Sequence, residues 1–353
     1  MQHTRRHWGL RVLGGLLVLG LIVTSSSAIQ AQTTATQVRS IRRALKQNHA
    51  QAIVIVNGRG QAPRIIQTTT GRNAATADRL FPIASLQKVM TGVSLAQLIR
   101  QNKLTLNDRL SRYYPHVRYA HQITVQQLIT HSSGIRDRLP APAAVLPTQN
   151  QQLAFTLRNL RSTGHHFWHY SNAEYGLLSG IISRVSKTPY QQYLTRNVLK
   201  RAGLSSTQFA FYNHVHRVTT VPVSTTGLNG FDQVANFNRL QRTMAGAPGA
   251  GELYCTPRGY WQFIQALTHN KLVPLKMITK RVAIEGGPWY FDGVYNHPGL
   301  IHADGANNGY DCTFYCDYRH HKTLMLFTTN MSFVHMETLG YKLFKIYFGY
   351  SYE

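Results

Sequence analysis

Hydrophobic and polar residues alternate with two different periods along the chain, and the shorter period predicts strands near its front. The runs 52–56 and 64–69 are short and rich in apolar and β-branched residues, and a turn with Gly58 and Gly60 separates them. Such a pair predicts a β-hairpin, because glycine allows a tight reversal between two extended segments. Ahead of it, Val38 to Lys46 has the apolar spacing of a short basic helix.

Helical spacing dominates the middle of the chain, where apolar residues recur every three to four positions. Thr124 and Thr256 are placed as helix N-caps, since a threonine oxygen can accept a hydrogen bond from the first helical turn. Loops are predicted at 139–147 and 218–230, and a turn at 246–251, from their proline and glycine content. The predicted helices are 86–100, 104–110, 123–129, 150–160, 171–186, 189–199 and 256–267.

After residue 285 the period changes to two, which is the period of half-buried strands. A closing helix then begins at Ser332, with Leu339, Leu343 and Ile346 on one face. The predicted strands of this region are 289–295, 300–303, 310–317 and 323–329.

This order of elements predicts an α+β fold. Two strands at the front, four at the back and helices between them fit one antiparallel sheet flanked by helices, with an inserted all-helical lobe. We expect one domain of residues 40–349, with a sheet lobe from 40–80 and 250–349 and a helical lobe from 81–249. With 43% hydrophobic and 14% charged residues, the chain can bury a core of that size.

The first 31 residues have the three-part pattern of a secretory signal. Three arginines precede an apolar run of 12 residues, Val12 to Val23, and small residues follow as far as Ala31. That run is shorter than the ~20 residues of a comfortable membrane span. We therefore expect a signal peptide at 1–31, with an uncleaved anchor as the alternative, and a linker at 32–39. The expected location is secreted or extracellular, at the cell wall or membrane.

The charge balance limits the kinds of partner that this chain is expected to bind. The chain has 38 Lys and Arg against 13 Asp and Glu, a formal charge of +25. These cations are spread out, without a long basic block, zinc-finger spacing or RNA-binding signature, so we expect no nucleic-acid partner. A basic exported protein instead fits a surface of anionic cell-wall polymer or anionic lipid. We expect a monomer.

The cysteines and histidines give no sign of a disulfide framework or a metal site. Cys312 and Cys316 lie four apart on one predicted strand, about 13 Å from each other and too far to bridge. Cys255 could pair with at most one of them, so we expect free thiols. The scattered histidines lack metal-ligand spacing. We expect no metal and no cofactor.

Ser85 and Lys88 form the first candidate catalytic pair. Pro82 favours extended backbone before Ser85 and helix formers follow it, so Ser85 is expected on a first helical turn, where free N–H groups gather. Lys88 lies three residues on and shares its face. A lysine whose pKa is lowered by burial can take the proton of a serine nucleophile. The alternative is an N-cap serine with a solvated lysine, since S-x-x-K is common by chance.

Tyr170 and Asn172 form the second candidate pair. They lie two apart on an extended turn before a predicted helix, so both side chains can point into one cleft. A tyrosine phenol can relay protons where nearby cations lower its pKa, and an asparagine amide both donates and accepts hydrogen bonds. Alone, the pair also fits a buried tyrosine beside an asparagine cap.

These two pairs, followed by a strand with Gly305, resemble the serine β-lactamase and penicillin-binding protein superfamily. The similarity is to the branch of class C β-lactamases, D-alanyl-D-alanine carboxypeptidases and related esterases, and it covers about residues 40–349. It implies a small antiparallel sheet flanked by helices, with the active site between the sheet and a helical lobe. Segments that match F-x-I-A-S, I-T-V-x-x-L-L-x-H-x-S-G and G-x-L-x-x-T motifs are 81–85, 123–134 and 251–256.

The resemblance also implies roles for the four residues of the pairs. Ser85 would be the nucleophile that accepts the acyl group, and Lys88 would take its proton. Tyr170 would pass a proton toward the leaving group, and Asn172 would hold the substrate amide.

The resemblance also implies places for Gly305, Ala306 and His131. The oxyanion hole would combine the backbone N–H of Ser85 with that of Ala306, on the strand with Gly305. His131 would support the fold.

The third motif departs from the family. Relatives have K-T-G or H-x-G there, which places a cation beside a substrate carboxylate. Counting back from Gly305, Ala303 stands at the lysine or histidine position and Asp304 at the next. His302 is one residue early, so it would face the other side of the strand unless a bulge corrects it. We keep His302 as a candidate substrate-binding residue, and Asp304 would repel a carboxylate.

The expected enzyme is an exported serine hydrolase with an acyl-Ser85 intermediate. The leading hypothesis is a D,D-carboxypeptidase or peptidase acting on D-alanine-containing cell-wall peptide. An esterase that removes D-alanyl esters from teichoic acid is the second, favoured by the missing cation and the high positive charge. A β-lactamase is the third. An idle cell-wall-binding protein is the alternative outside enzymes, and the intact pairs argue against it.

Overall fold

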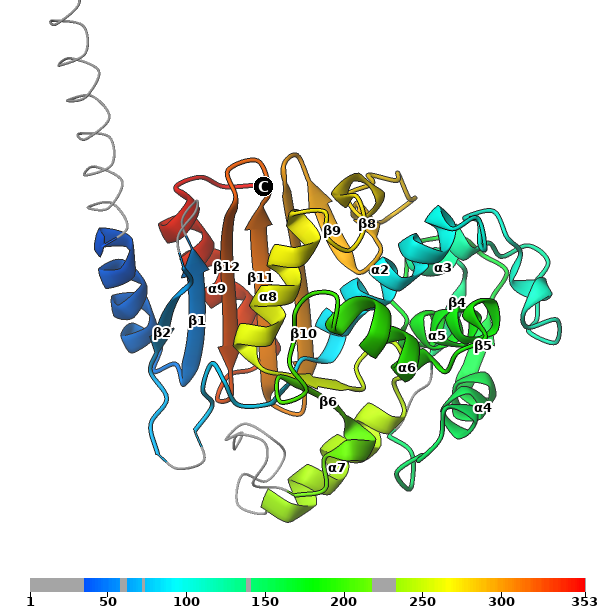
Figure 1. Ribbon diagram of the computed structural model, residues 1–353, viewed down its shortest axis with the longest axis horizontal. Helices are drawn as coiled ribbons and strands as arrows, with labels where there is room; N and C mark the ends of the chain where they lie inside the picture. The colour runs from blue at the N-terminus through cyan, green and yellow to red at the C-terminus, as the bar shows by residue number, and fades with distance from the viewer. Residues whose placement is uncertain (1–34, 58–61, 72–73, 138–140, 218–232, 353) are drawn as a thin grey trace, which may run out of the picture.

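The computed structural model describes residues 35–57, 62–71, 74–137, 141–217 and 233–352, and Figure 1 shows their arrangement. The predicted signal at 1–31, the turn with Gly58 and Gly60 and the loop at 218–230 lie outside the described residues. A helix over residues 35–47 begins within the predicted linker. No helix of the described part is long and apolar enough to cross a membrane.

One seven-stranded antiparallel sheet organises the molecule, in the order β2-β1-β12-β11-β10-β9-β8 (Figure 1). Strands from the two ends of the chain are neighbours in this sheet, since β1 hydrogen-bonds to β12 along its whole length. The predicted α+β fold with a sheet split by a helical insertion is confirmed. The strands are β1 (Ala52–Asn57), β2 (Arg64–Gln67), β8 (Tyr290–Phe291), β9 (Val294–His297), β10 (Leu300–Asn307), β11 (Tyr310–Asp317) and β12 (Lys322–Thr328).

The segment predicted as one strand at 289–295 is instead a tight hairpin of β8 and β9. Asp292 and Gly293 form its turn, both with positive φ. The turn lies against the helix that follows Ser85, because a methyl group added at Gly293 would come within 2.4 Å of the Lys88 carbonyl carbon. Periodicity alone cannot show such a reversal, because both arms continue the same alternation.

The two faces of the sheet bury different helices. On one face, residues such as Val54 and Leu326 pack with Leu343 of α9 (Phe333–Phe348) and with the helix at 35–47. On the other face, Ile55 and Phe327 belong to the larger core, which includes α8 (Pro257–Thr268) and the helical lobe. Figure 1 shows α8 in front of the sheet and α9 behind it.

The helical lobe is built around one buried helix, α2, in which every residue from Gln87 to Leu98 is buried. The N-caps predicted at Thr124 and Thr256 are present, each accepting a backbone N–H. The helices of the lobe are α2 (Gln87–Arg100), α3 (Val125–Ile129), α4 (Gln149–Asn159), α5 (Asn172–Ser186), α6 (Tyr190–Leu194) with the π-helical turn Thr195–Leu199, and α7 (Gln233–Ala245).

Two predictions about the lobe differ from the structure. The segment predicted as a helix at 104–110 consists of turns that end in the short 3-10 helix Leu110–Arg112. The helix α7 was not predicted at all. The short strands outside the main sheet are β3 (Phe81–Pro82), β7 (Leu253–Cys255) and β6 (Phe209–Phe211), which pair as one sheet, and β4 (Ile135–Asp137) with β5 (Leu160–Ser162).

Candidate active site

Ser85 lies on a sharp turn between β3 and α2, as the sequence predicts. The extended residues of β3 pair with β7, and the 3-10 helix Ala84–Leu86 follows after Ile83. Ala84 has a φ of 45°, which is unusual for a residue with a side chain. This conformation directs the chain abruptly from strand to helix and exposes Ser85 at the edge of a cavity.

Lys88 is fully buried beneath Ser85. Its Nζ donates hydrogen bonds to Ser85 Oγ at 2.9 Å, to Asn172 Oδ1 at 2.7 Å and to the Ala250 carbonyl at 3.3 Å. Burial lowers the pKa of this ammonium to about 7, against the smaller opposing attraction of Asp137. Near neutral pH a large share of Lys88 is therefore unprotonated and able to accept the serine proton.

Tyr170 faces the same serine from the opposite wall. Lys88 Nζ lies 4.7 Å from the centre of its ring. Burial nevertheless raises the pKa of the Tyr170 phenol, and its hydrogen bond with Ser85 offsets only part of that effect. The lowered pKa that would suit this phenol for proton relay is therefore not found, because desolvation dominates. The phenol is thus a proton donor in the resting site.

Asn172 begins α5, and its side-chain oxygen and backbone N–H are both held by hydrogen bonds. Its side-chain oxygen accepts from Lys88, which leaves the Nδ2 group free to donate into the cavity. Its backbone N–H donates to Asp137 Oδ2 at 3.0 Å. Asp137 therefore positions Asn172 and adds a negative charge near Lys88. Nothing in the local sequence marks Asp137, which reaches the site from β4.

His131 supports this wall from behind, in line with the structural role implied by the resemblance. It is fully buried, its ring lies 4.3 Å from that of Tyr170 at a tilt of 43°, and its Nδ1 accepts the Ser171 N–H at 3.3 Å. The same nitrogen is hydrogen-bonded to the Glu174 carboxyl group, which also accepts from Ser133. Burial lowers the pKa of His131 and raises that of Glu174, so both effects favour a neutral pair.

The strand β10 passes directly against the nucleophile. A methyl group added at Gly305 would lie 2.6 Å from the Ile83 carbonyl oxygen and 3.3 Å from the Ser85 nitrogen. Only glycine allows this approach, which places the next residue, Ala306, on the cavity wall. Ser85 and Ala306, the two residues whose backbone N–H groups the resemblance implies as an oxyanion hole, therefore line the same cavity.

The register of β10 settles where the residues of the third motif lie. Its pairing with β11 is continuous from Leu300 to Asn307, without a bulge. Ala303 therefore shares the face of Gly305, and His302 lies on the opposite face with Asp304. His302 stacks between Tyr295 and Tyr315 and does not line the cavity. Its position gives no support to the substrate-binding role predicted from the sequence.

The cavity over Ser85 has a volume of about 330 Å³ and an acidic side. Its wall combines the Ser85 turn, Tyr170, Asn172, the β8–β9 hairpin, β10 and the start of α9. Asp304 and Glu337 line it, and among the described residues no lysine, arginine or histidine does. No local pattern in the sequence points to Glu337, since α9 contributes it from the far end of the chain.

Burial also affects the two acids of this cavity. It raises the pKa of Asp304 to about 7, and it raises the pKa of Glu337 as well. Within the described residues, the basic side chain paired with Asp304 is His302, whose Nε2 lies 3.8 Å from Oδ2. Burial holds the pKa of that imidazole at about 3, so it carries no charge near neutral pH. A cationic group on a substrate would be the natural counter-charge for this side.

Metal chemistry has no evident ligands in the part of the chain that the structure covers, where no three His, Cys, Asp or Glu side chains gather. Cys255, Cys312 and Cys316 are buried and unlinked. The site brings together a serine, a buried lysine of lowered pKa and a protonated phenol. The class of enzyme that this fold and site define is a serine hydrolase.

Comparison with known proteins gives the family. The chain belongs to the beta-lactamase family, whose model matches residues 39–342. The "Putative penicillin-binding protein PbpX" of Bacillus subtilis (strain 168) is 26% identical over 291 residues, which are 80% of this chain and 72% of that protein. The resemblance read from the motifs is thereby confirmed.

Solved structures show the same fold. The D-amino acid amidase from Ochrobactrum anthropi SV3 superimposes with a TM-score of 0.74 at 18% identity, over 89% of this chain and 98% of that one. A penicillin binding protein from Bacillus halodurans gives a TM-score of 0.69 at 17% identity, over 86% and 99%. At these identities the likeness concerns the fold, and the substrate has to be argued from the cavity.

Proposed function

We propose that this protein hydrolyses D-aminoacyl esters or amides whose acyl group carries a free ammonium, with the D-alanyl ester of an anionic cell-wall polymer as the substrate class. The observation that carries the proposal is the acidic side of the cavity, where Asp304 and Glu337 stand and the lysine or histidine of relatives is replaced by Ala303. An α-ammonium next to the scissile carbonyl would complement these carboxylates. The name of the D-amino acid amidase adds support for the D-aminoacyl group.

The reaction follows from the contacts of Ser85. Its Oγ attacks the ester carbonyl while its proton passes to the neutral Lys88 Nζ, 2.9 Å away. The backbone N–H groups of Ser85 and Ala306 stabilise the oxyanion. As the carbon–oxygen bond to the alcohol breaks, Tyr170 delivers a proton to the leaving oxygen and regains one from Lys88. Water then attacks acyl-Ser85 and loses its proton to the same lysine, which passes a proton to the leaving Ser85 Oγ as the amino acid is released.

The leading expectation from the sequence, a D,D-carboxypeptidase, becomes the second candidate. Its substrate ends in a carboxylate, which needs a cation in the cavity. Lys88 is buried behind Ser85 and already holds three acceptors, so it offers no such contact. Asp304 would repel that carboxylate in the ionised form.

We place this activity outside the cytoplasm, on the pattern of a charged, apolar and small-residue segment at 1–31. The formal charge of +25 supports the polymer as partner, because a basic enzyme concentrates at a polyanion.

The test compares three substrates of the full-length protein that differ in charge near the scissile bond. These are the D-alanyl ester of glycerol, its N-acetyl derivative, and a peptide that ends in D-alanyl-D-alanine. The proposal expects the free ammonium ester to have at least about tenfold higher kcat/KM than the N-acetyl ester. Equal values for the two esters, or faster cleavage of the peptide, would reject it. Ser85→Ala supplies the background rate.

A further inference from the structure

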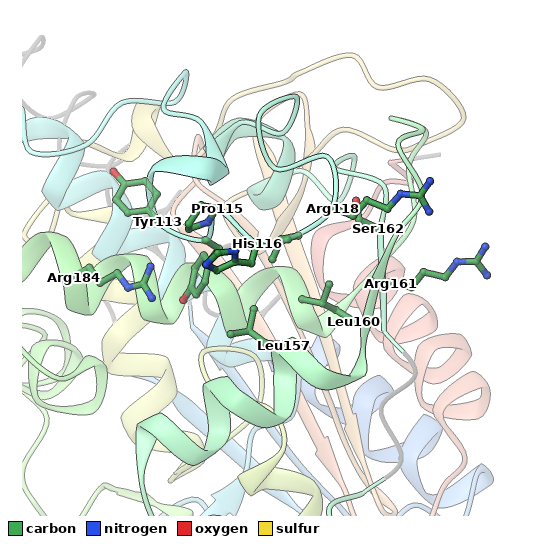
Figure 2. A pocket seen from close by; sticks show the side chains of 11 residues that line it. Tyr113, Pro115, His116, Arg118, Leu157, Leu160, Arg161, Ser162 and Arg184 are labelled. Atoms are coloured by element: carbon green, nitrogen blue, oxygen red, sulfur yellow. The ribbon is translucent and has the colours of Figure 1, made fainter.

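A second cavity, of about 530 Å³, opens in the helical lobe and shares no lining residue with the one over Ser85 (Figure 2). The segment 113–118 forms one wall, and the end of α4 with β5 forms another. Arg184 of α5 completes it. Neither the reaction proposed above nor the motifs of the chain assign any role to this place.

The cavity is strongly basic. Arg118, Arg161, Arg184 and His116 line it, and no aspartate or glutamate does. None of the three arginines takes part in a salt bridge within the described residues. In Figure 2, Arg184 lies on one side of His116, while Arg118 and Arg161 lie on the other. An anion with charges at two or more positions could contact both sides.

Ser162 supplies an independent sign of a ligand. Its side chain is only 6% exposed and it lines the cavity. Its Oγ is buried and has no hydrogen-bond partner in the described structure. A buried hydroxyl without a partner costs about 1–3 kcal/mol, and a change of the Ser162 rotamer that turned Oγ toward the cavity would let a ligand oxygen remove that penalty.

The floor of the cavity suits the uncharged part of such a ligand. Leu157 and Leu160 point into it in Figure 2, and Tyr114 also lines it. The Arg184 guanidinium stacks over that ring at 4.3 Å, which fixes its planar group at the rim. Planar guanidinium groups bind phosphate oxygens in pairs, and apolar side chains accommodate the carbon stem between phosphates.

We propose that this cavity binds a phosphodiester segment of an anionic polymer with short polyol units. A recessed site with cations on two sides fits a chain whose successive phosphates are separated by a few carbons. A lipid surface fits less well, because Leu157, at 38%, is the single strongly exposed large apolar side chain among the lining residues.

Binding of a polymer in this cavity would bring its neighbouring units close to Ser85. Asn172 and Arg184 stand 12 residues apart on α5, which corresponds to about 18 Å along the helix. A polymer held at Arg184 would keep its neighbouring units near the cavity over Ser85 and raise their effective concentration. The binding step itself does not depend on the proposed esterase activity.

The experiment measures binding of a fluorescent glycerol phosphate oligomer, free of aminoacyl esters, to the full-length protein by anisotropy. Because the probe has no scissile ester, a failure of the proposed function leaves this test intact. Arg161→Gln combined with Arg184→Gln should weaken binding at least about tenfold. Arg42→Gln combined with Arg43→Gln is the matched control, since both arginines are exposed on the helix at 35–47 and the same charge is removed. The control should change binding less than about twofold.

Leu157→Trp tests the cavity without altering any charge, because the larger ring would occupy the space at its exposed edge. It should weaken oligomer binding several-fold, with an unchanged melting temperature as evidence of folding. Equal losses in the two double variants would mean general charge attraction and would overturn the proposal. So would inorganic phosphate binding as tightly as the oligomer, or phosphatidylglycerol vesicles binding more tightly through the same arginines.

Discussion

Lys88 Nζ and Ser85 Oγ are 2.9 Å apart, in a hydrogen bond that only a neutral lysine can convert into proton transfer. The lysine is fully buried, and its attraction to Asp137 does not offset the cost of that burial. Its pKa of about 7 makes the protonation state of one side chain the switch for the nucleophile.

The pH dependence of the reaction follows from this pair. Lys88 must lose its proton, so kcat/KM for the N-acetyl ester should rise with pH and reach its plateau above about 7. For the ammonium ester the rise should be steeper, because Asp304, with a pKa of about 7, must ionise as well. Above pH ~8 the substrate ammonium loses its proton and the rate should fall. A profile that decreases from pH 5 to 7 would contradict the role of Lys88.

Lys88→Met should separate catalysis from stability. The variant keeps a long side chain and removes the base, so kcat should drop by at least about 10³-fold. The melting temperature should stay equal or rise, because a buried ionisable group is replaced by an apolar one. Stopped-flow acylation and calorimetry on the same samples measure the two effects. Ser85→Ala, with the lysine retained, should abolish turnover and leave the melting temperature within a few degrees.

Gly305→Ala tests the close passage of β10 beside the nucleophile. The added methyl group would meet the Ile83 carbonyl oxygen at 2.6 Å, so the strand must shift away from Ser85. We expect a loss of about 1–3 kcal/mol in the free energy of unfolding. A fall of ~10²-fold in kcat should accompany it, since Ala306 moves with the strand.

Gly251→Ala is the control for this substitution. Its added methyl group would lie 3.5 Å from the nearest backbone atom of Ala84, which is ordinary contact. It should leave both stability and rate close to those of the unchanged protein. Equal effects of the two substitutions in denaturant titrations and rate assays would show that the close approach of β10 at Gly305 is not needed for stability or catalysis.

The sequence predicts the parts of the site that depend on local spacing, and it misses those that depend on packing. Ser85 and Lys88 are three residues apart on a helix start, so their contact follows from the helix itself. Asp137 and Glu337 reach the site from β4 and α9, which only the tertiary structure brings there. The raised pKa of Tyr170 could not be predicted, because the burial that causes it depends on the tertiary structure.

The fold, like the site, has parts that the local sequence pattern predicts and parts that it does not. The alternation in β10, β11 and β12 predicts strands, and their order predicts one antiparallel sheet, as found. The hairpin of β8 and β9 was missed, because Gly293 turns the chain in a segment whose alternation is uninterrupted. Whether His302 faces the cavity depends on whether β10 has a bulge, which the sequence does not show. The continuous pairing of β10 with β11 in the structure shows that it has none.

Asp304 should set the response to β-lactams, whose carboxylate lies close to the reactive carbonyl. With Asp304 and Glu337 on the cavity wall and no lining cation, the intact protein should acquire a penicillin adduct slowly. Asp304→Asn removes one charge at nearly equal volume, so the adduct should form several-fold faster, and the preference for the ammonium ester over its N-acetyl derivative should shrink. Intact mass measurements over time follow the first effect, and ester kinetics follow the second.

Arg258→Gln is a suitable control for this last comparison, because its exposed partner Asp78 lies outside the cavity. It should change neither the adduct rate nor the ester preference. Rapid adduct formation on the unchanged protein would show that the cavity accepts a carboxylate despite Asp304, and would favour the D,D-carboxypeptidase. Consumption of the penicillin without a lasting adduct would indicate a β-lactamase, since the acyl-Ser85 intermediate would then be open to water.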